Sequence, residues 1–125
     1  MHLKYIVASI LLLLIDTIWI SIIKTKFGNM IRHIQGEEMT INVASVAFAY
    51  MSLVILYNYF ILKDNKSIFD AFILGCLAYA VYEFTNKAVI KNWSSQIVLF
   101  DTLWGGILFA TVTIIIKFLK NKNLL

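Results

Sequence analysis

The segment YIVASILLLLIDTIWISII, residues 5–23, is a nearly unbroken apolar run that is long enough to cross a lipid bilayer. A transmembrane helix needs about 20 mostly apolar residues. Three further windows of this kind follow along the chain, at 41–62, 68–86 and 96–118. Backbone polar groups in lipid must be satisfied internally, and these runs lack the alternation of a β-barrel strand. The sequence therefore predicts an all-α integral membrane bundle of four transmembrane helices, with residues 1–125 in a single domain.

The overall composition also indicates a membrane protein. Of the 125 residues, 61% are hydrophobic, 14% are charged and none is proline. Soluble domains are about 45–50% apolar and about 25% charged, and a soluble globule of this size could not bury so much apolar surface. The net charge of +4 is spread over both ends of the predicted bundle, which favours contact with lipid headgroups. The lipid bilayer is the expected partner, and nucleic acid is not.

Four spans place both termini on the same side of the membrane, and the short segment 63–67 makes the second and third spans antiparallel neighbours. The terminal side carries six basic residues: Lys4, Lys63, Lys66, Lys117, Lys120 and Lys122. The opposite side, here called the loop side, carries five: Lys24, Lys26, Arg32, Lys87 and Lys91. Six against five favours cytoplasmic termini, although so small a difference also permits insertion in both orientations. The strong preference for lysine over arginine is typical of an AT-rich genome and indicates a bacterial or viral source.

Three acidic residues, Asp16, Glu83 and Asp101, fall inside predicted spans. A charged side chain near the bilayer centre costs roughly 2.5–3.5 kcal/mol. From the helical rise, Asp16 lies about 10 Å, Asp101 about 7 Å and Glu83 about 5 Å from the loop-side boundary. Because alternate spans run in opposite directions, we expect the three acids to meet at one depth, in the loop-side half of the bundle.

Helical periodicity adds polar and aromatic side chains to these inward faces. A stripe of small residues from Asn42 to Ser52 predicts close packing of the second span, and Gly105 and Gly106 predict close packing of the fourth. The candidate substrate- or ion-binding residues are Asp16, Trp19, Asn42, Tyr79, Tyr82, Glu83, Asn86, Asp101 and Trp104.

The first and last spans share a short motif, Asp-Thr-x-Trp. It occurs once at Asp16–Trp19 and once at Asp101–Trp104. The two spans run in opposite directions, so an inverted repeat of the kind found in many transporters is one explanation. Chance and convergent site chemistry are the alternatives.

With these residues in view, the chain resembles a family of small membrane proteins catalogued as domain of unknown function 2177. The resemblance rests on four segments: Ile15–Ile20, Asn42 with Ala47, Phe48 and Tyr50, Ala78–Ala88 continuing to Trp93, and Asp101–Gly105. Glu83 stands where the family pattern leads us to expect aspartate. The resemblance implies four spans and no established activity.

Several smaller features have specific interpretations. We expect Trp93 to belong to an interfacial aromatic belt, and Lys87 to pair with Glu83 at the i,i+4 spacing. We interpret Gly36–Glu38 in the loop 24–40 as a solvated turn. A short amphipathic segment across Phe27–Ile34 on the membrane surface is an alternative that the sequence leaves open.

The sequence leaves three functions open. The preferred one is a small transporter or channel-like protein for protons, cations or a small cationic solute, with a homodimer or partner membrane protein completing the pathway. The second is a membrane-embedded enzyme or accessory subunit acting on a lipid or isoprenoid, and the third is a scaffold in which the acids join helices. A hard cation is a further option, with oxygen ligands from Asp16, Asn42, Glu83, Asn86 and Asp101. No catalytic residue is identified and no cofactor is expected.

Overall fold

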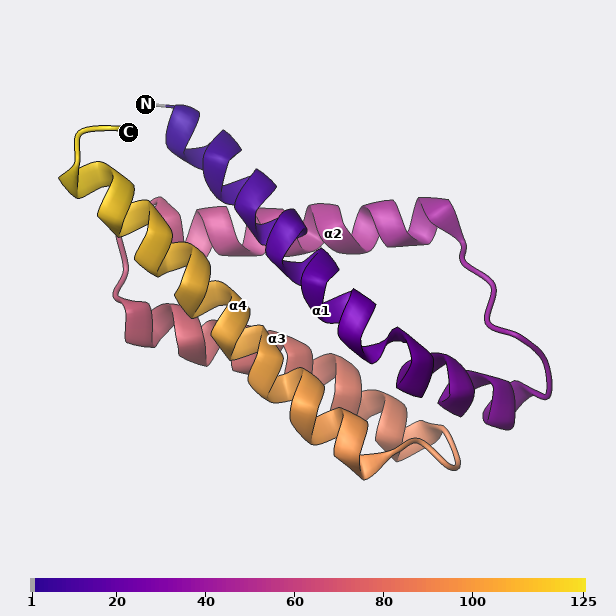
Figure 1. Ribbon diagram of the computed structural model, residues 1–125. Helices are drawn as coiled ribbons and strands as arrows, with labels where there is room; N and C mark the ends of the chain where they lie inside the picture. Colours follow the sequence, from indigo (N-terminus) through magenta and orange to yellow (C-terminus); the bar gives the residue numbers. More distant parts are fainter. Residues whose placement is uncertain (1) are drawn as a thin grey trace.

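The computed structural model describes residues 2–125, which form four long helices and no strand (Figure 1). The elements are α1 (Leu3–Gln35), α2 (Val43–Tyr57) with the π-helical turn η1 (Asn58–Leu62), α3 (Ile68–Val89) and α4 (Ser95–Asn121). Counting η1 as the continuation of α2, all four helices are long and apolar enough to cross a membrane. The beginning of α1 and the end of α4 lie at the same end of the bundle (Figure 1), here called the terminal end. The four-span, all-α prediction is confirmed.

Helix α1 is longer than the sequence predicted. The expected loop at 24–40 is helical as far as Gln35, so the segment Phe27–Ile34 is the last part of α1 and not a separate surface helix. The helix ends at Gly36, which adopts a left-handed conformation (φ 81°) and donates its N–H to the carbonyl oxygen of Arg32 at 2.8 Å. This glycine termination is favoured because glycine has no Cβ to clash in that conformation.

The other three helices begin at polar caps. The side chains of Asn42, Ser67 and Ser94 accept hydrogen bonds from the backbone N–H groups of Ser45, Asp70 and Ile97. Each cap satisfies a donor that the first turn of a helix leaves free. These caps set the observed starts of α2, α3 and α4 within two residues of the predicted ones.

Glycines allow α3 and α4 to pack closely. A Cβ at Gly75 would collide with the carbonyl oxygen of Gly105, and a Cβ at Gly105 would collide with that of Gly75. A Cβ at Gly106 would likewise collide with the thiol sulfur of Cys76. Small residues that let two backbones approach are a common means of helix association in membranes. The close packing expected at Gly105 and Gly106 is therefore confirmed.

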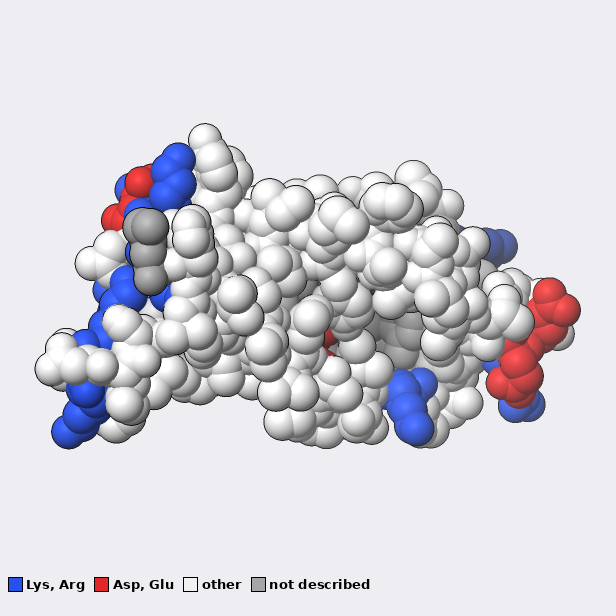
Figure 2. Space-filling view, turned by 90° about the horizontal axis from the view of Figure 1, so that it is seen from above, with Lys and Arg blue, Asp and Glu red and all other residues white. Residues whose placement is uncertain are grey.

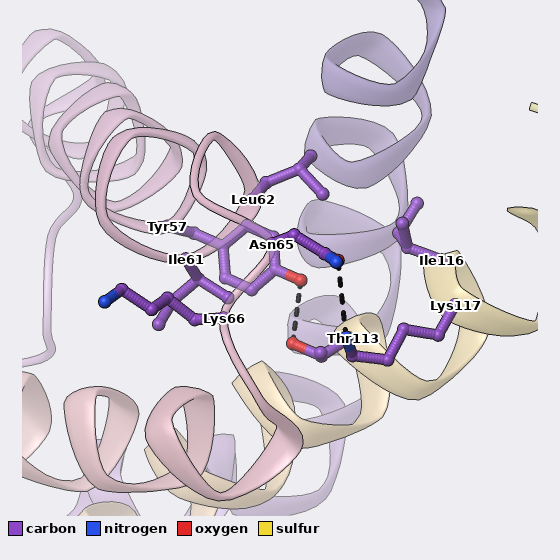
Figure 3. Close-up of a pocket in the computed structure, with 8 residues that line it drawn as sticks. All are labelled: Tyr57, Ile61, Leu62, Asn65, Lys66, Thr113, Ile116 and Lys117. Atoms are coloured by element: carbon purple, nitrogen blue, oxygen red, sulfur yellow. Dashed lines mark hydrogen bonds between the residues drawn. The ribbon is translucent and has the colours of Figure 1, made fainter.

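Helix α2 is anchored at the terminal end. Tyr57 is buried there, its ring packs edge-on against Phe109 with centroids 5.2 Å apart, and its hydroxyl is hydrogen-bonded to Thr113 Oγ1 at 2.8 Å. Close by, Lys117 Nζ donates to Asn65 Oδ1 at 3.3 Å (Figure 3). The gap among these side chains is only about 10 Å³, room for one water molecule at most.

The loop-side half of α2 is different. Helix α2 as a whole crosses the direction of the other helices (Figure 1), and in this half Ser45, Ala49 and Ser52 are exposed. The close packing of the second span that the small-residue stripe predicted is therefore wrong. Small residues permit close approach but supply little attraction of their own, because lipid solvates an apolar helix as well as a neighbouring helix does. Helix α2 is thus joined to the other helices at the terminal end and diverges from them toward the loop end, where α1, α3 and α4 stay packed around Met30, Trp93 and Ile97.

Candidate binding site

Asp16 lies where all four helices meet. Its side chain is 4% exposed and accepts hydrogen bonds from one residue on each of the other helices. Tyr50 of α2 donates to Oδ2, while Tyr79 of α3 and Trp104 of α4 donate to Oδ1, at 3.4 Å and 2.8 Å. These donors offset the cost of placing a carboxylate in the bilayer, and they hold α2, α3 and α4 around one point of α1.

The two Asp-Thr-x-Trp motifs contact each other, and the tryptophan of each motif donates a hydrogen bond to the aspartate of the other. Trp104 donates to Asp16, and Trp19 Nε1 donates to Asp101 Oδ1 at 3.0 Å. The indole rings of Trp19 and Trp104 are stacked, with centroids 5.1 Å apart and planes 10° from parallel. The two copies of the Asp-Thr-x-Trp motif in the sequence therefore correspond to two segments that bind one another reciprocally.

Glu83 is the most deeply buried acid, with 1% of its surface exposed. Its Oε1 accepts a hydrogen bond from Trp93 Nε1 at 2.9 Å. Its Oε2 is buried and has no hydrogen-bond partner among the described residues. The side chain lies next to that of Asp101 on α4, and the two acids line the same cavity.

The predicted roles of Trp93 and Lys87 need correction. Trp93 is 4% exposed, packs edge-on against Phe27 and binds Glu83, so it is part of the interior and not of a lipid-facing belt. Lys87 does not pair with Glu83; its Nζ donates to the backbone carbonyl of Trp93 at 2.9 Å. Lys87 thereby holds the α3–α4 turn in the conformation that presents the Trp93 indole to Glu83.

A cavity of about 560 Å³ occupies the space between the spread half of α2 and the other helices. Figure 2 shows it as a hollow in a mostly uncharged part of the surface, with an acidic side chain visible inside and a basic one at its edge. Three acidic residues and a single basic one lie on its wall, and the remainder is aromatic or aliphatic. The lining residues are Asp16, Trp19, Ile20, Ile23, Lys24, Phe27, Met39, Ile41, Val46, Ala49, Tyr50, Leu53, Ala78, Tyr79, Tyr82, Glu83, Ile97 and Asp101.

Most of the residues singled out from the sequence lie at this cavity. Its wall includes Asp16, Trp19, Tyr79, Tyr82, Glu83 and Asp101. Trp104 is outside the lining, but it binds Asp16 and stacks on Trp19. Asn42 and Asn86 do not line the cavity; Asn42 uses its side-chain oxygen to cap α2.

The five-ligand arrangement suggested for a hard cation is not formed. Asn42 and Asn86 lie outside the cavity, which leaves only three of the five expected ligands on its wall. Across residues 2–125, no three His, Cys, Asp or Glu side chains are close enough together to hold a metal ion. A hard cation needs about six or more oxygen ligands at short distances.

Besides the apolar lining, two cavity residues with polar groups were missed from the sequence: Tyr50, which binds Asp16, and Lys24. The position of Tyr50 could have been predicted from the helical rise. Nine residues of helix from Ile41 place it about 14 Å from the loop-side boundary, close to the depth of Asp16. The position of Lys24 could not, since a lysine at the end of an apolar run is usually a headgroup anchor.

Comparison with known proteins agrees with this architecture. Residues 1–118 match the model of a family described as a predicted membrane protein, DUF2177. No curated protein and no solved structure gives a significant match. The match spans all four helices and both Asp-Thr-x-Trp motifs, so the chain belongs to the DUF2177 family of membrane proteins.

Proposed function

We propose that the protein binds a small organic cation with an apolar body in this cavity and carries it across the membrane. The observation that supports the proposal is the cavity itself, in which three acids stand on a wall that is otherwise mostly apolar and aromatic. Its volume of about 560 Å³ lies within the range of about 300–1,000 Å³ that is usual for small-molecule sites.

The chemistry of the wall favours a cation over other ligands. Asp16, Glu83 and Asp101 face a single basic residue, Lys24, so an anionic ligand would meet an excess of acidic groups. The rings of Trp19, Tyr79 and Tyr82 offer cation–π contacts and apolar area to the body of an organic cation. A bare proton or metal ion would leave most of the cavity unfilled.

Access to the cavity follows from the spread of α2. Val46 and Ala49 line the cavity and also belong to the exposed half of that helix. A ligand could therefore enter from the side, between helices, at the level of the membrane. Four helices seldom enclose a complete pathway, so we expect a second copy or a partner membrane protein to cover the open side.

The same lateral opening favours a second candidate, an enzyme or accessory subunit acting on a lipid or isoprenoid. Paired carboxyl groups below the headgroups could serve general acid–base chemistry. This candidate predicts altered lipid extracts in cells that express the protein. The scaffold interpretation suits Asp16, whose two oxygens both accept hydrogen bonds, but it requires Glu83 Oε2 to be satisfied by a proton shared with the adjacent Asp101.

The test uses three probes with the same phenylbutyl body: 4-phenylbutyltrimethylammonium, 4-phenylbutylamine and 4-phenylbutan-1-ol. Binding to the purified protein should be measurable for both cations and at least about tenfold weaker for the neutral alcohol. Uptake into proteoliposomes is best followed with the trimethylammonium compound, because its permanent charge slows passive diffusion.

Asp101→Asn should lower both binding and uptake, whereas the matched change Asp70→Asn, at an exposed acid in the first turn of α3, should not. If the alcohol binds as well as the two cations, or if Asp101→Asn changes neither binding nor uptake, the proposal is wrong.

A further inference from the structure

The three acids of the cavity differ in how many hydrogen bonds they already accept. Asp16 accepts three, from Tyr50, Tyr79 and Trp104. Asp101 accepts one, from Trp19, and Glu83 accepts one, from Trp93. Because a carboxylate has about four acceptor positions, Asp16 is nearly saturated, while Asp101 and Glu83 are not.

Among the carboxyl oxygens of these three acids, only Glu83 Oε2 is buried without a hydrogen-bond partner within residues 2–125. No N–H or O–H group of the described residues donates to it; the carboxyl of Asp101 lies within hydrogen-bond reach of Glu83 and is an acceptor while it is ionised. Leaving a buried acceptor unpaired costs free energy, and the cost is greater for a charged group. Buried polar atoms without a partner are uncommon in native structures and call for a specific explanation such as an absent ligand.

The position of this atom suggests what the absent partner is. Oε1 is turned toward Trp93, while the neighbour of Glu83 on α4 is Asp101, a second acceptor. Both acids line the cavity; Glu83 is almost fully buried, and the partly exposed Asp101 is the more accessible of the two. Two adjacent acceptors are best satisfied by a group that carries several donors and a positive charge.

We infer that the ligand of the cavity is a protonated amine, whose N–H groups bridge Glu83 Oε2 and the Asp101 carboxylate. An ammonium group offers three donors on one small charged centre, whereas a quaternary ammonium offers none. The inference rests on the proposed function and divides the acids by role. Glu83 and Asp101 form the cation subsite, and Asp16 positions the helices around it.

Comparison of the amine with its N-trimethyl analogue isolates the hydrogen bonds from the charge, because the two probes share both charge and body. The amine should bind the wild-type protein at least about tenfold more tightly, which is the contribution expected of a hydrogen bond between charged partners. Titrations of the purified protein in detergent at neutral pH would measure both affinities.

Glu83→Gln should abolish this preference. The substituted glutamine side chain retains an oxygen for Trp93, and its amide NH₂ can itself donate toward Asp101, so the ligand's donors lose their acceptor. Glu37→Gln, at an exposed position outside the cavity, is the matched control and should keep the preference. Thermal unfolding of each variant shows whether the fold is retained.

The outcomes separate the two proposals. If the amine and the trimethylammonium compound bind equally well, with both better than the alcohol, the inference is overturned and the proposed function stands; Glu83 Oε2 would then be satisfied by a proton shared with Asp101. If neither cation binds better than the alcohol, both fail. The wild-type comparison requires no variant, so it decides the question even if Glu83→Gln does not fold.

Discussion

Trp104 Nε1 donates to Asp16 Oδ1 at 2.8 Å, although the two residues are 88 positions apart in the chain. Trp19 donates reciprocally to Asp101, and the indole rings of the two tryptophans are stacked on each other. A polar contact in a bilayer competes with apolar lipid and not with water, so donor and acceptor have no solvent alternative. The pair of bonds thereby fixes α1 against α4 at the depth of the cavity.

Asp16→Ala should lower the free energy of unfolding, because Asp16 joins the helices. The change leaves Tyr50, Tyr79 and Trp104 without an acceptor. At about 0.6 kcal/mol for each interhelical bond in a membrane, the expected loss is about 2 kcal/mol. Reversible unfolding in mixed detergent micelles measures it, with Asp64→Ala in the exposed turn before α3 as a control that should lose almost nothing. Equal stability of the two variants would show that Asp16 does not hold the helices together.

Trp19→Phe and Trp104→Phe should each cost about 0.6 kcal/mol, because each removes one interhelical N–H donor and keeps an aromatic ring. Their effects should not be additive, since the rings are stacked and each binds the acid of the other motif. A double-mutant cycle of unfolding free energies checks the coupling. A coupling energy of zero would mean that the two motifs act independently.

Much of the site could be predicted from the sequence because helices are regular. The rise per residue placed Asp16, Glu83 and Asp101 at one level, and the structure has all three on one cavity wall. The tilt of α2 could not be predicted, since nothing in the stripe around Ser45 and Ala49 distinguishes a neighbouring helix from lipid. It is the tilt that creates the cavity.

The buried position of Trp93 could not be predicted from the sequence for a different reason. It follows Asn92, which adopts a left-handed conformation (φ 69°), and this turn points the indole back toward Glu83. Such a conformation is uncommon outside glycine, and asparagine tolerates it better than most residues. Local turn geometry therefore decided between an aromatic belt and a buried donor, and helical periodicity carries no information about it.

Gly75→Ala and Gly105→Ala should each destabilise the protein by more than about 2 kcal/mol, because the added methyl group would collide with backbone of the facing helix and backbone cannot rotate away. Gly28→Ala is the matched control. Gly28 is also helical, but nothing lies near its missing Cβ, so alanine there should be neutral or stabilise by about 0.5–1 kcal/mol. Melting temperatures of the three variants in one detergent test the contrast. Similar melting temperatures would mean that α3 and α4 do not pack through these glycines.

Ala49→Phe should block the cavity while leaving the fold intact. Ala49 lines the cavity on the exposed half of α2, so a phenyl ring at this position can extend into open space without displacing a packed neighbour. We expect binding of 4-phenylbutyltrimethylammonium to weaken at least about tenfold, because the added ring occupies volume that the body of the ligand needs. Ala47→Phe, two residues away on the same helix, exposed and outside the lining, adds the same ring without filling the cavity and should bind as the wild type does. If Ala49→Phe bound the probe as tightly as Ala47→Phe, the ligand would have to bind elsewhere on the protein.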